Sequence, residues 1–362
     1  MAGVKGRVAG CRRKLQHVAR NEGRRPTLED VAAHAGVSRA LVSIVMRGVA
    51  GASAETRERV LAAAAEIGYR PDTRARLLAS GNSRQIGVVF GMAGRFHAEL
   101  LDGLYVAAEK ARYELILSAM TPTRDERTAA ETLLGFRCEA VILLGPGLEG
   151  VPVLAGRLPV TVIGWRVADP SVDVVRTADD EGMRLAVDHL AGLGHREITY
   201  VDGGSGAIAT ARRRAYRAVM RRRGLGDGLR VIPGGDSLDA GVAAARLVLD
   251  GERRPTALIA YNDDVAAGLV ESLGSAGIRV PRDMSIVGWD DSPPARLPHL
   301  NLTTVQQDPV EMSRLAVERS VSRLRGETIG QREIVLSPGL IIRTSTAALG
   351  HDAPPERGDR TP

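Results

Sequence analysis

Residues 27 to 47 constrain the fold of this chain more than any other stretch, because they predict two short helices joined by a tight turn. Thr27 is a good N-cap, and Asp30 follows three residues later, which is close to a capping box. Gly36 supplies a turn in which a positive φ costs little, and Ser38 caps the second helix. The general alternative is any α-hairpin. Because the cap and turn positions are suitably filled, the pattern favours a helix-turn-helix, whose second helix enters the major groove of DNA.

A third helix and a shorter fourth one are predicted next. Ser53 is a suitable N-cap for a helix that ends near Gly68 and whose apolar stripe covers the first two helices. Pro71 then opens a short helix before a polar break. Because so short a helix is marginal alone in water, we expect DNA and a second copy of the chain to stabilise it. We therefore assign residues 26–70 to a DNA-binding domain and residues 71–84 to a hinge helix and linker.

From residue 85 onwards, apolar strand segments alternate with amphipathic helix segments. Strands separated by helices of roughly 10–15 residues indicate parallel sheets with helices on both faces. Roughly 260 residues of this pattern divide most naturally into two doubly wound lobes. The predicted strands lie at 86–90, 113–118, 140–144, 160–163, 198–201, 231–232, 257–260 and 285–288.

Three N-terminal segments carry a family pattern. They read T-L-E-D-V-A-A-H-A-G-V-S at residues 27–38, S-A-E-T-R-E-R-V at residues 53–60 and G-Y-R-P at residues 68–71. In these segments, and over nearly all of the remaining chain, the sequence resembles the lactose-repressor/galactose-repressor (LacI-GalR) family. The resemblance implies an α/β fold: a helix-turn-helix domain with a hinge helix, then a core similar to a periplasmic sugar-binding protein. Such a core has two lobes of doubly wound parallel sheets, joined by three crossovers around a ligand cleft.

The resemblance also sets the expected domain boundaries. The first lobe of the core is closed by a helix from the C-terminal region, and the second lobe by the end strands. A basic tail precedes the DNA-binding domain, and a tail containing proline and glycine follows the core; both are expected to be disordered. The expected ranges are 1–25 for the basic tail, 85–346 for the core, 85–178 plus 307–329 for lobe 1, 179–305 plus 330–346 for lobe 2, and 347–362 for the final tail.

Charge and composition limit the class of protein. The net charge is +6, and the first 25 residues hold eight basic residues against one acid. Such an arm adds attraction to phosphates, unless it is an inert extension or reflects a start codon placed too far upstream. Two cysteines form neither a disulfide framework nor a metal cluster, and we expect no cofactor. Without a spanning run of roughly 20 apolar residues or a secretory signal, we expect a cytoplasmic, nucleoid-associated protein without a membrane partner.

The start of the second helix carries the candidate base-reading residues. Arg39 can donate two hydrogen bonds to guanine, although a phosphate contact is the alternative, and Ala40 can meet a thymine methyl group. Ile44 and Arg47 depart from the family pattern, so the resemblance implies an operator half-site that is not the commonest one. Serine hydroxyls suit phosphate contacts that fix the register. The candidate DNA-binding residues of this domain are Thr27, Ser38, Arg39, Ala40, Ser43, Ile44 and Arg47.

The predicted hinge helix adds three candidate DNA contacts. The resemblance places Leu78 at the family's lever leucine, which enters the minor groove, and Ala75 at its small neighbour. An apolar wedge of this kind kinks the duplex. Arg74 lies on the flank, where it can meet phosphates. The alternative is that the leucine packs two hinge helices together, and both roles are compatible. We therefore expect a homodimer on a double-stranded, pseudopalindromic operator.

Side chains that follow the predicted core strands form the candidate effector site. In open α/β lobes, ligands bind beyond the carboxyl ends of the strands. The resemblance carries Asn262, Asp290 and Arg212 onto ligand-contacting positions in lobe 2. It also implies that Phe96 and His97 line the site from lobe 1.

Aromatic residues at this site are uncertain contacts. Trp289 is a candidate for stacking on a ligand ring, with ordinary core packing as its alternative, and the same holds for Trp165. Asp263 is interpreted as a helix N-cap. Ser237 stands where many relatives have an aromatic lid, which weakens any assignment to one sugar.

Together these patterns predict a ligand-responsive transcription regulator, most simply a repressor, whose effector is a sugar or a related polar metabolite. One alternative is a DNA-binding dimer with a vestigial cleft, and another is a solute-binding protein. Catalysis is not expected, because the glycine-rich segment 203–206 lacks phosphate-loop patterns. In addition, His189 and His195 are six residues apart, unlike the usual zinc spacing.

Overall fold

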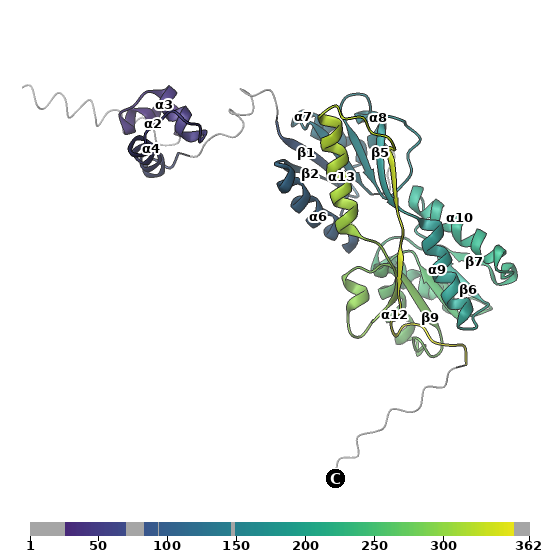
Figure 1. The fold of residues 1–362 in the computed structure, drawn as a ribbon. Coiled ribbons are helices and arrows are strands. Elements are labelled where there is room, and N and C mark those ends of the chain that lie inside the picture. Colours follow the sequence, from purple (N-terminus) through teal and green to yellow (C-terminus); the bar gives the residue numbers. More distant parts are fainter. Residues whose placement is uncertain (1–25, 70–82, 93, 146–148, 351–362) are drawn as a thin grey trace, which may run out of the picture. The chain divides into compact units, whose positions relative to one another are not determined.

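A computed structural model describes residues 26–69, 83–92, 94–145 and 149–350 of the chain. The chain divides into two compact units, residues 1–82 and residues 83–362, and each is described by itself. Figure 1 shows the helices and strands of both units. The predicted basic tail and the hinge residues Arg74, Ala75 and Leu78 lie outside the described residues.

The described residues 26–69 of the N-terminal unit form three helices, as the sequence predicts for this stretch: α2 (Leu28–Ala35), α3 (Arg39–Met46) and α4 (Ala54–Glu66). Thr27 and Asp30 form a complete capping box on α2. Gly36 has φ 65° and ends α2 in the left-handed region, and the Ser38 side chain accepts a hydrogen bond from the backbone of α3. Small and β-branched side chains allow the helices to pack closely around a core of Val31, Ala32, Ala35, Val42, Val45, Val60, Ala63 and Ala64.

The first lobe of the core is a six-stranded parallel sheet in the order β11-β5-β4-β3-β1-β2. Its apolar strands are covered on one face by α6 and α13 and on the other by α7 and α8. Its elements are β1 (Gln85–Gly91), α6 (Arg95–Ala111), β2 (Glu114–Met120), α7 (Glu126–Gly135), β3 (Ala140–Leu144), α8 (Gly150–Leu154), β4 (Val160–Ile163), β5 (Val172–Thr177), α13 (Pro309–Leu324) and β11 (Glu333–Leu336).

The second lobe is also six-stranded, in the order β12-β10-β9-β8-β6-β7. All its pairs are parallel except β12, which runs antiparallel to β10. Helices α9 and α10 cover one face, and α11 and α12 cover the other. Its elements are α9 (Asp179–Gly192), β6 (Ile198–Val201), α10 (Ala207–Arg222), η1 (Gly226–Gly228), β7 (Arg230–Ile232), α11 (Leu238–Leu249), β8 (Ala257–Ala260), α12 (Asp263–Ser275), β9 (Ser285–Asp290), η2 (Pro293–Arg296), β10 (Thr303–Gln306) and β12 (Gly339–Ile341).

The chain crosses between the lobes three times: from β5 to α9, from β10 to α13, and from β11 to β12. The last crossover is visible in Figure 1 as the yellow segment that joins the two lobes. The α/β fold with two doubly wound lobes is therefore confirmed. Among the described residues, no helix combines the length and apolar character needed to cross a bilayer.

One lobe boundary was wrong. We expected residues 330–346 to lie in lobe 2, but β11 pairs with β5 in the sheet of lobe 1. The reason is local: Ile334 and Leu336 pack on the lobe 1 core, and Glu333 forms an ion pair with Arg176 across the β11–β5 pair.

The start of the expected C-terminal tail was also wrong. The Ala347 backbone N–H donates to the Ser285 hydroxyl, and its carbonyl oxygen accepts from the His195 ring. The Leu349 N–H donates to the Leu193 carbonyl. The first residues of the expected tail are thus fixed to lobe 2 by hydrogen bonds, and within that tail only residues 351–362 lie outside the described structure.

Candidate nucleic-acid interface and ligand cavity

The exposed side of α3 carries the predicted base-reading residues. Val42 and Val45 face the core, whereas Arg39 and Ala40 are exposed at the start of the helix. The Arg39 Nε–H donates to Glu29 Oε1 at 2.8 Å, and both side chains remain more than 60% exposed, at 67% and 62%. Arg39 is therefore solvent-exposed, and its partner is solvated and weakly held.

The other predicted DNA contacts lie around this position. The Ser38 side chain caps α3, so its hydroxyl serves the helix terminus. Ser43 and Ile44 are half-buried, and the Arg47 Nε–H donates to the Ser43 carbonyl at 3.1 Å. Thr27 is tied to Asp30 by its backbone N–H and its hydroxyl. Arg39, Ala40 and Arg47 are thus the most available of these side chains.

A cavity of about 280 Å³ lies between the two lobes of the core. Lobe 1 contributes the start of α6 and the ends of β3 and β4, and lobe 2 contributes the loops after its strands, as predicted for open α/β lobes. Several glycines in the lining bring the backbone close to the cavity. The lining includes the predicted residues Phe96, His97, Arg212, Asn262 and Asp290, together with Ser205, Asp236, Tyr261, Gln307 and Met312, which were not predicted as effector contacts.

Arg212 is the buried cation of this cavity. Its Nε–H donates to Asp179 Oδ1 at 3.0 Å, and its Nη1–H donates to the Tyr261 carbonyl at 2.7 Å. Its guanidinium carbon lies 4.1 Å from the Trp289 ring centroid and 5.0 Å from that of Tyr261. Burial raises the pKa of Asp179, although Arg212 opposes this shift. Arg212 is therefore held in one orientation by an ion pair, a carbonyl and two aromatic faces.

Trp289 does not line the cavity, which corrects its prediction as a ligand contact. Its side chain is fully buried in the lobe 2 core, and it supports Arg212 from behind. Lobe 2 instead contributes the aromatic side chain of Tyr261 to the cavity wall, and lobe 1 contributes that of Phe96. The space therefore has aromatic surface even though Ser237, at the position of the missing lid, is only the N-cap of α11.

Asp290 supplies a buried carboxyl group at the end of β9. It accepts a hydrogen bond from the Gln307 amide at 2.7 Å. Burial raises the pKa of Asp290 well above its usual range, against the attraction of Arg212 and with a further contribution from Asp263. Gln307 directly follows β10, which pairs with β9 in the sheet. This strand pairing brings Gln307 to Asp290, and the sequence alone does not indicate it. Asp290 and its neighbour Asp291 both have positive φ, 111° and 56°, so the chain turns sharply at the cavity wall.

The N-cap of α12 is not the residue that we expected. Asn262 is the N-cap: its Oδ1 accepts from the Val265 N–H at 2.9 Å, and its amide donates to the Asp236 carbonyl. Asp263, which we interpreted as the cap, is instead fully buried and accepts from Ser292 and Thr304. Burial raises the pKa of Asp263 to about 7. Asn262 still lines the cavity.

At the start of α6, Phe96 and His97 face the space from lobe 1. The His97 Nδ1–H donates to the Gly91 carbonyl at 3.2 Å, which fixes the ring against the end of β1. Arg95, one residue before Phe96, pairs with Asp264 of lobe 2 through Nε and Oδ1 at 3.7 Å.

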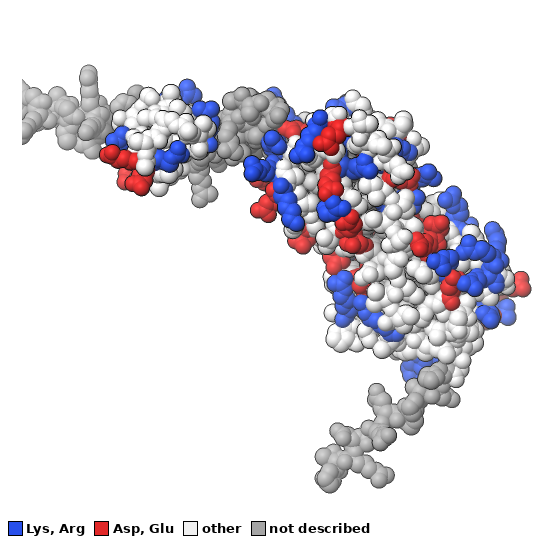
Figure 2. Space-filling view, in the orientation of Figure 1, with Lys and Arg blue, Asp and Glu red and all other residues white. Residues whose placement is uncertain are grey.

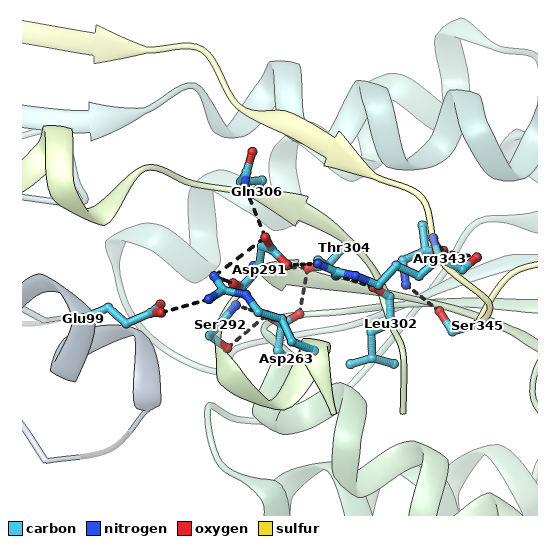
Figure 3. A network of polar contacts seen from close by, with 11 residues as sticks. Glu99, Asp263, Asp291, Ser292, Leu302, Thr304, Gln306, Arg343 and Ser345 are labelled. Atoms are coloured by element: carbon cyan, nitrogen blue, oxygen red, sulfur yellow. Dashed lines mark hydrogen bonds and ion pairs between the residues drawn. The ribbon is translucent and has the colours of Figure 1, made fainter. Parts of the chain in front are cut away.

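A second interlobe contact is visible in Figure 3. Asp291 accepts hydrogen bonds from Gln306 and Arg343, at 3.1 and 2.6 Å. Arg296 contacts Asp291 and also reaches Glu99 of α6, with 3.7 Å between Nη1 and Oε1. Burial raises the pKa of Glu99. The two lobes are thus joined beside the cavity by charged side chains, while the cavity itself offers one buried cation with balancing carboxyl groups.

Comparison with known proteins gives concordant matches in both units. Residues 27–72 match "Bacterial regulatory proteins, lacI family", and residues 187–346 match "Periplasmic binding protein-like domain". The ribose operon repressor of Haemophilus influenzae is 28% identical, with 89% of this chain and 99% of the relative covered. The HTH-type transcriptional regulator CelR of Thermobifida fusca is 31% identical, with coverages of 89% and 98%. The crystal structure of the lac repressor dimer bound to operator and the anti-inducer ONPF has a TM-score of 0.80 at 28% identity, covering 90% of this chain and all of that chain.

Proposed function

Because this chain belongs to the lacI family of bacterial regulatory proteins, we propose that a small polar effector in the interlobe cavity controls how its helix-turn-helix domain binds operator DNA. The chain is a DNA-binding transcription regulator, of the repressor type, and not an enzyme. Its partners are double-stranded operator DNA, an effector and a second copy of itself.

The dimer sets the form of the operator. The related lac repressor binds its operator as a dimer. By analogy, two copies of this chain bind a pseudopalindrome, each through one α3 helix. We propose that Leu78 of the hinge segment enters the minor groove, with Ala75 as its small neighbour, and that Arg74 meets phosphates. We place the protein in the cytoplasm, associated with the nucleoid, because its operator is there.

Within each half-site, α3 supplies the contacts. Arg39 reads a guanine after it releases Glu29, which costs little because both side chains are solvated. Ala40 and Ile44 contribute apolar contact to thymine methyl groups. Ser38, Ser43, Arg47 and Thr27 position the helix on the phosphate backbone.

The effector is best described as a neutral polyhydroxylated compound. The observation that carries this is the cavity chemistry: Arg212 is already paired with Asp179, while Asp290 and Asp236 add carboxyl groups without a matching cation in the described lining. Hydroxyl groups can donate to these carboxyls and to Asn262, and accept from Arg212. Tyr261 and Phe96 offer faces for an apolar ring surface. A volume of about 280 Å³, at the lower end of small-molecule sites, suits a single sugar ring.

A thermal-shift screen of the full-length protein tests this assignment. Neutral sugars and polyols are compared with sugar phosphates, and a specific ligand raises the melting temperature through binding linkage. We expect a neutral compound to stabilise the wild type, and Asp290→Asn to abolish that shift. The same compound should change operator affinity in a mobility-shift assay. Stabilisation by sugar phosphates alone would refute the neutral-effector assignment, and absence of any hit with intact operator binding would favour a vestigial cleft.

A further inference from the structure

A second groove of about 670 Å³ lies beside the effector cavity, on another face of α10. Both lobes line it. Trp165, Arg166 and Arg176 come from lobe 1, and the starts of α9 and α10 come from lobe 2. The crossover from β5 to α9 passes between Arg176 and Asp179, so the groove lies where the chain passes from lobe 1 to lobe 2.

The sequence of α10 builds the floor of this groove. Ala209 and Arg212 point to the effector cavity, whereas a separate helical face presents Ala207, Ala211 and Ala218. These alanines recur at spacings of four and seven residues, so their methyl groups lie in one row. Because the side chains are small, they leave room for a flat apolar ligand. Ile208 borders both spaces and separates them.

The charged groups of the groove are not balanced among themselves. Arg166 and Arg176 share the single carboxylate of Glu333, at 3.2 and 2.6 Å. The Asp179 carboxylate is already committed to Arg212 on the far side. Arg214 makes no ion pair or hydrogen bond within the described part of the chain.

Asp180, the remaining acid, lies in the first turn of α9, where the helix N-terminus stabilises its charge. One positive charge is therefore in excess along the groove. Figure 2 shows basic side chains over the α10 region of lobe 2.

Trp165 gives an independent indication of a ligand. Its side chain is 2% exposed and forms part of the groove wall. Its indole N–H is buried and has no acceptor among the described residues. A buried donor without a partner is costly, and a ligand acceptor in the groove would relieve this cost after a small adjustment of the ring.

We propose that this groove is a second small-molecule site, which binds an organic anion with a flat apolar body. The apolar part lies on the alanine row of α10, and the anionic group pairs with Arg214 and the Arg166–Arg176 pair. This site differs in chemistry from the effector cavity, which lacks an unpaired cation in its described lining. A ligand here contacts both lobes and the Asp179 that holds Arg212.

The probe for the test is 1-anilinonaphthalene-8-sulfonate, a flat anion whose fluorescence rises in an apolar site. Full-length wild type should bind it saturably with one probe per chain. Arg214→Glu and Ala211→Phe remove the charge partner and fill the alanine row, so each should weaken binding at least about tenfold. Arg221→Glu is the matched control, because Arg221 is exposed on the same helix but lies outside the groove. Unchanged melting temperatures show that the variants are folded.

The pattern across the variants decides the outcome. Loss of probe binding in Arg214→Glu and Ala211→Phe with retention in Arg221→Glu supports the groove. Equal weakening by Arg214→Glu and Arg221→Glu shows a general charge effect and overturns the proposal. Wild-type affinity in Ala211→Phe places the probe elsewhere and also overturns it. Operator binding, measured in parallel, is independent of every one of these results.

Discussion

The DNA-reading surface and the effector cavity are built in opposite ways. On α3, the main candidate Arg39 is 67% exposed and held by one solvated carboxylate. In the cavity, Arg212 is 5% exposed and is fixed by Asp179, the Tyr261 carbonyl and the Trp289 ring. An exposed side chain can exchange water and a weak partner for a base at little cost. A buried one is expensive to disturb, so it defines the shape that a ligand must fit.

This difference predicts that loss of the guanidinium group has unequal effects at the two arginines. Arg212→Met leaves Asp179 buried without its partner, which should lower the free energy of unfolding of the core by about 3–5 kcal/mol. Chemical denaturation measures this loss. Effector stabilisation in the thermal-shift assay should disappear as well.

The double variant Arg212→Met/Asp179→Asn separates stability from binding. Removing the stranded charge should restore part of the stability without restoring effector binding, because the hydrogen-bond donors of Arg212 are still missing. If the double variant is no more stable than Arg212→Met, the ion pair does not account for the cost.

At the exposed site, Arg39→Ala should leave the free energy of unfolding nearly unchanged and weaken operator binding by about 1–3 kcal/mol. Mobility shifts on an operator selected from random duplexes, compared with a scrambled duplex, measure discrimination. Arg59→Ala is the control, since Arg59 is an exposed arginine on α4. An equal loss on both duplexes would mean that Arg39 contacts phosphate and reads no base.

The buried carboxyl group of Asp263 should make core stability depend on pH, in contrast to the solvated α3 surface. Burial raises the pKa of Asp263 to about 7, above its value in an unfolded chain. The folded state therefore retains a proton that the unfolded state loses, so stability should fall as pH rises from about 4 to about 7. Denaturant midpoints across this range measure the slope, and Asp263→Asn should flatten it. An unchanged slope in that variant would assign the dependence to other groups.

The contrast also explains which features were predictable from sequence. The caps Thr27 and Ser38 and the turn at Gly36 act over three or four residues, so local patterns identify them. Asn262 and Asp290 follow strands whose carboxyl ends must meet, so they too were placed correctly beside the cavity.

Long-range contacts account for the errors. Whether Trp289 faces the ligand or stacks behind Arg212 depends on packing between α9, α10 and β9. The role of Gln307 depends on pairing between β10 and β9, and the sheet that β11 joins depends on its fit to β5. Neither residue type nor periodicity distinguishes these outcomes.

The smallest expected effect is that of Glu29, the ion-pair partner of Arg39, on operator binding. Glu29→Gln removes the carboxylate that accepts from Arg39 Nε at 2.8 Å. Because such an exposed pair contributes at most about 1 kcal/mol, operator affinity should rise only about two- to fivefold. Glu55→Gln is the matched control, since Glu55 occupies the first turn of α4 as Glu29 does in α2. A general charge effect raises affinity equally in both variants and persists when Arg39 is alanine. If Glu29 acts through Arg39, Glu29→Gln raises operator affinity more than Glu55→Gln does, and this gain vanishes in the Arg39→Ala background. A gain that persists in that background would reject the release of Arg39 as a step in DNA binding.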